Sequence, residues 1–202
     1  MSGPIRVRGL GVIALMAIAC LGNETIASSV LDITEDGWHT WRVPSIENSQ
    51  TFCCFSWTGS GARQRICDLD RGHGNYSSSS SIATHSGEIQ VYALIEAGKA
   101  SKISVLSPHC EVVASTEISD LGSVSADDSI DWLRPYITAK SDVASDALAA
   151  ISRHSGNYAF QVLAEVVESN ADYDFREEAI FWMVMSETEN AFAYIDRLIM
   201  GE

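Results

Sequence analysis

The sequence predicts an α+β fold, in which a small disulfide-pinned antiparallel β-rich domain (residues 28–122) precedes an α-helical domain (residues 123–202). Three observations support this prediction. Apolar residues recur with period two through the first part, which is typical of half-buried strands. From about Ser125 onward they recur with a period near 3.6, which is typical of amphipathic helices. Four cysteines in the first part follow a segment that resembles a secretion signal, so we expect them to be oxidised.

Residues 1–27 have the parts of a signal peptide. Arg6 and Arg8 form a basic start, residues 10–21 form an apolar stretch, and small side chains surround Ala27. The apolar stretch is far shorter than the ~20 residues that cross a bilayer. We therefore expect cleavage after Ala27 and a secreted or periplasmic protein. An uncleaved anchor or a cytosolic helix is the other interpretation.

Lipidation is a further interpretation of the same segment. Residues 17–20, with the sequence Ala-Ile-Ala-Cys, resemble a bacterial lipoprotein box, although Ala17 stands where leucine is usual. Cys20 would then carry a lipid anchor. The binding role that we expect is the same in either case.

The charge is strongly negative, with 27 acidic residues against 13 Lys and Arg and a net charge of −14. Removal of residues 1–27 leaves 26 acidic and 11 basic residues, or −15. Nucleic acids and anionic membrane surfaces would be repelled, so we expect neither as a partner. A cationic partner remains compatible with this charge.

The cysteines that remain after cleavage are even in number, which favours two disulfides. They are Cys53, Cys54, Cys67 and Cys110. A bond between the neighbours Cys53 and Cys54 would be strained. We therefore expect each of these two to pair with either Cys67 or Cys110, and both pairings stay open.

The β-rich part contains several segments with strand character. Alternating apolar and β-branched residues predict strands at residues 38–43, 51–58 and 65–69, and a hairpin over residues 88–107 that turns at residues 97–100. Residues 71–81, with the sequence RGHGNYSSSSS, are a loop by composition. Disulfides would stabilise the small core of such a domain.

The helical part contains five segments. Apolar spacing predicts helices near residues 128–139, 142–153, 159–168, 174–185 and 188–200. Ser125 and Asp128 form a capping-box-like start for the first helix. We expect Pro135 to kink or shorten that helix.

The last four helices repeat with an offset of 32 residues. Ala147 then aligns with Ala179, and Ile151 with Met183, so apolar positions match apolar positions. Two successive helical hairpins of this length are typical of an α-solenoid. Residues 174–180, with the sequence DFREEAI, are similar to the second-helix motif of HEAT-like repeats, and Ala144 stands where the first unit would carry the motif's Arg.

This resemblance to HEAT-like repeats covers residues ~140–202, the C-terminal third of the chain. It implies a stack of helical hairpins that presents surfaces to other proteins. The whole layout also resembles secreted bacterial proteins of unassigned role. Because two units are fewer than a stable solenoid usually has, we expect the β-rich part to cover one end of the stack.

The other end of the stack has no polar capping repeat. Leu198, Ile199 and Met200 come directly before Gly201 and Glu202. We therefore expect these three apolar residues to be a partner surface, covered by another protein or by a second copy of the chain.

Sites for metal or anion chemistry are poorly supported. A metal cluster of Cys53, Cys54, Cys67 and His73 lacks a second paired-ligand spacing, and an oxidising compartment favours disulfides. The loop at residues 71–75 does not match the spacing of a phosphate-binding loop. We expect no metal site and no cofactor site.

Catalytic residues are equally poorly supported. No histidine has an evident Ser, Asp or Cys partner in the sequence; the four considered are His39, His85, His109 and His154. No serine stands in a nucleophile-elbow context. The acidic residues near the start of the fourth helix suit the helix dipole and cap rather than acid–base chemistry; they are Asp172, Asp174, Glu177 and Glu178. Phe181 and Trp182 are expected in the core.

These observations lead to two functional hypotheses. The first is a non-catalytic secreted or periplasmic interaction protein, a scaffold or adaptor that acts through its helical hairpins. The alternative is a small-ligand-binding or enzymatic β domain, with its site near Trp41, Trp57 and His73 and with the repeats as support. A deep pocket lined by those three residues would favour the alternative.

Overall fold

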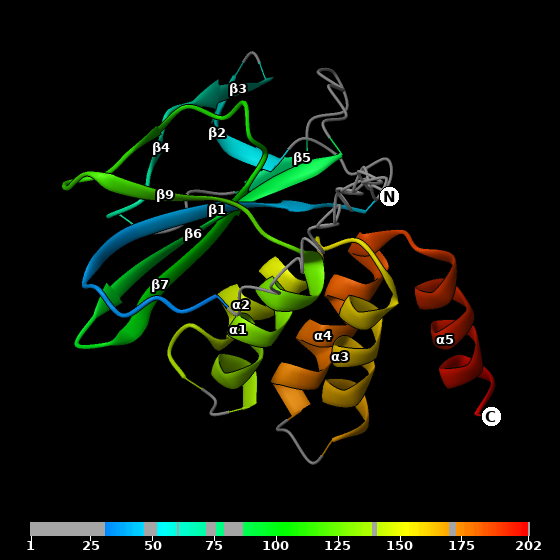
Figure 1. Cartoon of the computed structure of the whole chain (residues 1–202). Coiled ribbons are helices and arrows are strands. Elements are labelled where there is room, and N and C mark those ends of the chain that lie inside the picture. The colour runs from blue at the N-terminus through cyan, green and yellow to red at the C-terminus, as the bar shows by residue number, and fades with distance from the viewer. Residues whose placement is uncertain are drawn as a thin grey trace, which may run out of the picture.

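The computed structural model shows a mixed β-sheet covered on one face by helices and on the other by shorter strands (Figure 1). It describes residues 31–46, 52–59, 61–71, 76–78, 87–138, 141–169 and 173–201. The expected signal peptide, Cys20, His73 and most of the predicted 71–81 loop lie outside these residues, and Tyr76–Ser78 of that predicted loop form a short strand instead. The fold is α+β, with strands in the first part and five helices in the second.

The main sheet has four strands in the order β7-β6-β1-β9. They are β7 (Lys99–Leu106), β6 (Glu88–Glu96), β1 (Gly37–Pro44) and β9 (Ile118–Ser123). The pairs β1–β6 and β6–β7 are antiparallel, but β9 runs parallel to β1. The expectation of a purely antiparallel domain was therefore wrong. After β7 the chain crosses the other face of the sheet before it returns to the free edge of β1, and such a crossover permits parallel pairing.

The hairpin between β6 and β7 forms where the sequence predicted it. Ala97 and Gly98 form a two-residue connection, with φ angles of 52° and 72°. Positive φ at both positions is the requirement of a type I′ turn, whose twist matches that of the flanking strands. Glycine at the second position adopts this conformation without steric cost.

The remaining strands form two small sheets. In the first, β2 (Phe52–Thr58) pairs antiparallel with both β3 (Gly61–Arg65) and β5 (Tyr76–Ser78). In the second, β4 (Cys67–Asp68) runs parallel to β8 (Val112–Val113). These short strands cover the face of the main sheet that points away from the helices (Figure 1).

Both faces of the main sheet are buried because its strands alternate between two hydrophobic cores. One face contributes side chains such as Trp41, Val91 and Ile103 to a core that also contains Ile130 and Leu148 of the helices. The other face packs against the disulfide region; that core comprises Trp38, Tyr92, Leu106, Cys53, Phe55, Cys67, Leu69 and Cys110. The larger core is thus continuous between sheet and helices.

The five helices are α1 (Ala126–Thr138), α2 (Ala144–Ile151), α3 (Asn157–Glu168), α4 (Tyr173–Ser186) and α5 (Glu189–Met200). Helix α2 lies against β7, α4 packs on α2 and α3, and α5 packs on α3 and α4. The α1 helix continues past Pro135 to Thr138, so the expected shortening at the proline does not occur. Among the described helices, none is both long and apolar enough to cross a membrane.

Candidate binding surfaces

The predicted partner residues lie on the last turn of α5. Leu198 is 44% exposed, and Ile199 and Met200 are each 75% exposed. Figure 1 shows α5 at the outer edge of the helical layer, beside α3 and far from the main sheet. The structure thus leaves these three side chains accessible.

Exposed apolar side chains are concentrated on the last two helices. Within the described residues, seven of the ten exposed large apolar side chains lie on α4 or α5. They are Tyr173, Phe181, Val184, Phe192, Leu198, Ile199 and Met200. An apolar surface of this kind, bordered by polar residues, is typical of an interaction site.

On α5, three of these residues and the half-buried Ile195 form a stripe that we call the α5 outer stripe, made of Phe192, Ile195, Leu198 and Ile199. Their separations of three, four and seven residues place them on one side of the helix. Ala191 and Tyr194, next to the stripe, are buried against the preceding helices. The stripe therefore lies directly beside the face of α5 that is packed against the other helices.

The 32-residue offset allows this stripe to be compared with the equivalent residues of α3. Val166 and Val167 of α3 correspond to Leu198 and Ile199 of α5, but they are only 9% and 2% exposed. Helices α4 and α5 both pack on α3, and Arg176 of α4 reaches the Val167 carbonyl. Positions that the chain itself covers in the first pair of helices are thus open in the second.

Two acidic residues of α4, Glu177 and Glu178, bind neighbouring side chains, and Asp174 is the acidic residue in the first turn of the helix. The Glu178 carboxylate accepts hydrogen bonds from the Ser145 hydroxyl at 2.7 Å and from Trp182 Nε1 at 3.3 Å. A hydrogen bond to Glu177, with smaller contributions from its charge and from burial, raises the pKa of the exposed Tyr173 hydroxyl. Asp172 lies outside the described residues.

The aromatic pair of α4 divides between core and surface. Trp182 is half-buried, and the guanidinium of Arg153 lies 5.9 Å from its ring centroid and 4.9 Å from that of Phe52. Phe181 is 53% exposed, so its expected place in the core was wrong. Successive residues on a helix point about 100° apart. Trp182 therefore packs against the core while Phe181 faces solvent.

The four cysteines lie in two pairs at disulfide distance. Cys53 pairs with Cys110 and Cys54 with Cys67, with Cα–Cα distances of 5.5 and 5.3 Å. The structure thus selects one of the two pairings that the sequence left open. Cys53, His109 and Cys110 also group within 4.8 Å of one another. Because both of these sulfurs form a disulfide, they offer no thiolate to a metal.

A buried Ser–His pair is the main polar feature that the sequence reasoning missed. His154 Nε2 lies 2.7 Å from Ser129 Oγ, and its Nδ1 lies 2.8 Å from the Ala150 carbonyl. Since a carbonyl only accepts, Nδ1 carries the proton and Nε2 accepts from the serine hydroxyl. Ser129 Oγ in turn accepts from Trp41 Nε1 at 2.8 Å.

This Trp41–Ser129–His154 chain has the atoms of a catalytic dyad but no access for a substrate. All three side chains are fully buried. Burial lowers the pKa of His154 to about 4, so the ring is neutral at pH 7. This series of hydrogen bonds joins β1, α1 and the loop after α2. Trp41 and Ser129 lie 88 positions apart in the sequence. No local motif could have revealed it.

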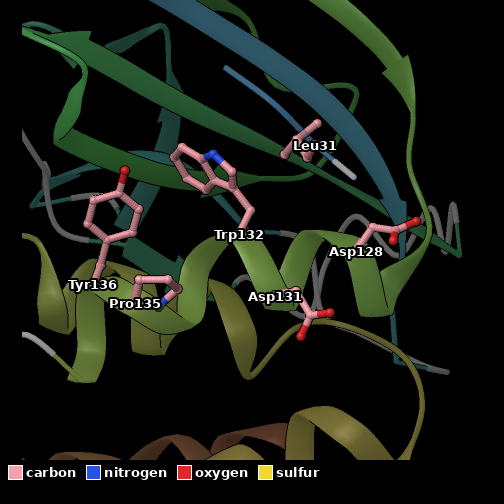
Figure 2. A pocket seen from close by; sticks show the side chains of 6 residues that line it. All are labelled: Leu31, Asp128, Asp131, Trp132, Pro135 and Tyr136. Carbon is pink, nitrogen blue, oxygen red and sulfur yellow. The ribbon is translucent and has the colours of Figure 1, made fainter. Parts of the chain in front are cut away.

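A pocket of about 330 Å³ lies beside α1. It is lined by Leu31, Asp128, Asp131, Trp132, Pro135 and Tyr136. Figure 2 shows Trp132 and Tyr136 pointing from α1 toward the sheet, while Asp131 points the other way. Both carboxylates already serve the fold, since Asp128 accepts from Ser125 and Asp131 from Tyr158.

Of the three residues predicted for a small-ligand site, only the Trp41 side chain is described, and it does not line this pocket. Trp41 is fully buried and lines no described opening. Its indole packs edge-on against Trp132, with the ring centroids 5.1 Å apart. His73 and the side chain of Trp57 lie outside the described residues.

Comparison with known proteins adds no relative to this description: neither the family models, nor the curated proteins, nor the solved structures contain a match to the chain.

Proposed function

We propose that this protein is a non-catalytic secreted or periplasmic interaction protein, a scaffold or adaptor that binds a protein partner through the outer side of its last helical hairpin. The observation that carries the proposal is the contrast between Val166–Val167 and Leu198–Ile199. The first pair is buried by the following helices, and the equivalent second pair is exposed.

The free energy of apolar burial favours a covered stripe. Burial of an exposed Leu or Ile side chain contributes about 1.5–3 kcal/mol. The α5 outer stripe, together with Phe181 and Val184 of α4, therefore offers enough apolar surface for a specific contact. The recurrence of fully buried positions at the 32-residue offset, Ala147 with Ala179 and Ile151 with Met183, supports a HEAT-like stack that a partner extends.

Location outside the cytoplasm is supported by two features. The cysteines are paired at disulfide distance, and disulfides persist in oxidising compartments. Residues 1–27 carry the pattern of a signal peptide. A lipid anchor at Cys20 is the alternative form of processing, and the mass of the mature N-terminus distinguishes the two.

Site-specific photo-crosslinking tests the proposal. A photoreactive amino acid replaces Ile199 in one variant and Val113 of β8, which is also exposed, in the matched control. In the cells that produce the protein, we expect a discrete protein adduct at position 199 and none at position 113. Absence of an adduct at position 199, or identical adducts at both positions, would contradict the proposal.

A small-ligand role is the second candidate, and the α1 pocket is its best support. Its volume is within the range of small-ligand sites, and two half-buried aromatic rings line it. A change in the NMR signals of Trp132 and Tyr136 when a metabolite is added would favour this role over the first.

A further inference from the structure

Carboxylates border the α5 outer stripe, whereas neutral residues border the equivalent stripe of α3. Glu189 and Asp196 are exposed and lie three residues before Phe192 and Ile199 respectively, so each adjoins the stripe. Thirty-two residues earlier, the equivalent positions are Asn157 and Ala164. Asn157 meets Asn190 of α5 in a neutral hydrogen bond of 2.9 Å.

The way in which the chain covers α3 shows what a partner of α5 should supply. Arg176 of α4 donates from Nε to the Val167 carbonyl at 2.8 Å. That carbonyl belongs to the last turn of α3, where the helix dipole favours a cation. The equivalent carbonyl of α5 is that of Ile199. A partner helix that covers α5 as α4 covers α3 would place a basic side chain there.

A second copy of the chain does not supply that cation from its described helices. Each described basic residue of the five helices already has a partner within the fold. Arg134 binds Glu165, Arg176 binds the Val167 carbonyl, and Arg197 lies over Tyr194; Arg153, just after α2, lies over Phe52. A twofold interface would also place the Glu189 and Asp196 carboxylates of both copies in one interface, which adds negative charge without a matching cation from the helices.

We propose that the α5 outer stripe binds a basic amphipathic helix of a partner protein, with apolar side chains on the stripe and Lys or Arg against Glu189, Asp196 and the last turn of α5. Apolar side chains separated by three, four and seven residues form the face by which one amphipathic helix packs on another. This inference rests on the proposed function and adds the chemistry of the partner.

Three labelled peptides of 18 residues test the inference with the whole mature protein. The first carries leucines on one helical face and lysines on the other. The second replaces every lysine with glutamate, and the third has the composition of the first in scrambled order. Fluorescence anisotropy at low and high salt should show binding of the first peptide alone, weakened by salt because the charge contacts are exposed.

Matched variants then assign the binding to α5. E189Q/D196N should weaken the lysine peptide roughly fivefold, the effect of two exposed charge contacts. L198S/I199S should weaken it at least roughly tenfold, because apolar burial is lost while every charge remains. E111Q/E117Q removes two exposed carboxylates in the β-rich part and should leave the affinity unchanged.

The outcomes that overturn the inference are distinct from those that overturn the proposed function. Equal binding of the lysine and glutamate peptides, or equal effects of E189Q/D196N and E111Q/E117Q, refutes a basic partner. Sedimentation showing a dimer that L198S/I199S abolishes makes a second copy the occupant instead. In both cases an adduct at position 199 would still support the interaction role, whereas its absence refutes that role itself.

Discussion

At the scale of single residues, His154 belongs to a hydrogen-bonded group that links the sheet to the helices through Ser129 and Trp41. His154 is wholly buried, and both ring nitrogens have partners within the protein. Just beside it, the backbone of Ser155 donates to the Pro44 carbonyl at 3.0 Å, which ties the end of β1 to the loop after α2. A buried polar network stabilises a fold only when every member is satisfied, and in this one each nitrogen is.

Acid should weaken the fold through this residue. The pKa of His154 is about 4 in the folded protein against 6.5 for an exposed histidine, because burial disfavours the charged ring. Protonation therefore favours the unfolded state. The contribution is complete above pH ~6.5 and is lost as the pH falls from ~6.5 to ~4, by about 3 kcal/mol in all. Urea unfolding at a series of pH values between 7.5 and 4 measures it.

Two variants separate this effect from the titration of the many carboxylates. H154Q should be less stable at pH 7.5 but should lose about 3 kcal/mol less than the wild type on acidification. H109Q, at an exposed position, should follow the wild-type profile. Parallel profiles for the wild type and H154Q would contradict the assignment.

At the scale of elements, the two disulfides secure β2 from both sides. Cys53 and Cys54 are neighbours on one strand, so their side chains point to opposite faces. One bridge spans 57 residues to the segment after β7, and the other spans 13 residues to β4. The Cys53–Cys110 bridge also lies inside the smaller core, on the face of the main sheet away from the helices, and both cysteines are buried there.

Loss of the longer bridge should cost more stability. In the chain-entropy account, C53A/C110A should lower the free energy of unfolding by about 4 kcal/mol and C54A/C67A by about 3 kcal/mol. Chemical denaturation of both variants and of the oxidised wild type at one pH provides the comparison. A larger loss for the shorter bridge would show that packing around Cys54, rather than loop closure, dominates.

At the scale of the whole molecule, one hydrophobic core joins the sheet to the helices. Ile130, Leu133 and Ile151 of the helices belong to the same cluster as Trp41 and Val91 of the sheet. Without the sheet, these helical side chains would be exposed to water. Each large apolar side chain exposed in this way costs about 1.5–3 kcal/mol, and domains have only about 5–15 kcal/mol in total.

The helical region alone should therefore not fold cooperatively. We expect residues 123–202, expressed without the sheet, to show no sharp thermal transition by circular dichroism. The matched control is the chain of residues 31–202, which keeps the shared core and should unfold in a single step. A cooperative transition of the short fragment would show that the helices form an independent stack.

Several elements could be predicted from local pattern because the physics that forms them is local. The β6–β7 hairpin followed from the period-two pattern and a turn predicted at residues 97–100, of which Ala97 and Gly98 form the connection, and the helices followed from the spacing of their apolar residues. The parallel strand β9 was missed because its pairing with β1 depends on the path of the intervening chain. The exposure of Phe181 was missed because the direction of a side chain depends on which helix packs beside it.

The sequence by itself determined the α+β class, the segments that become helices, the set of paired cysteines and the acidic charge, because each depends on composition or on contacts between near neighbours. The tertiary structure decided which cysteines pair, that Ser129 and His154 meet inside the core, and that Leu198 and Ile199 stay exposed where Val166 and Val167 do not. These outcomes depend on residues tens of positions apart that are brought together only when the helices pack on the sheet.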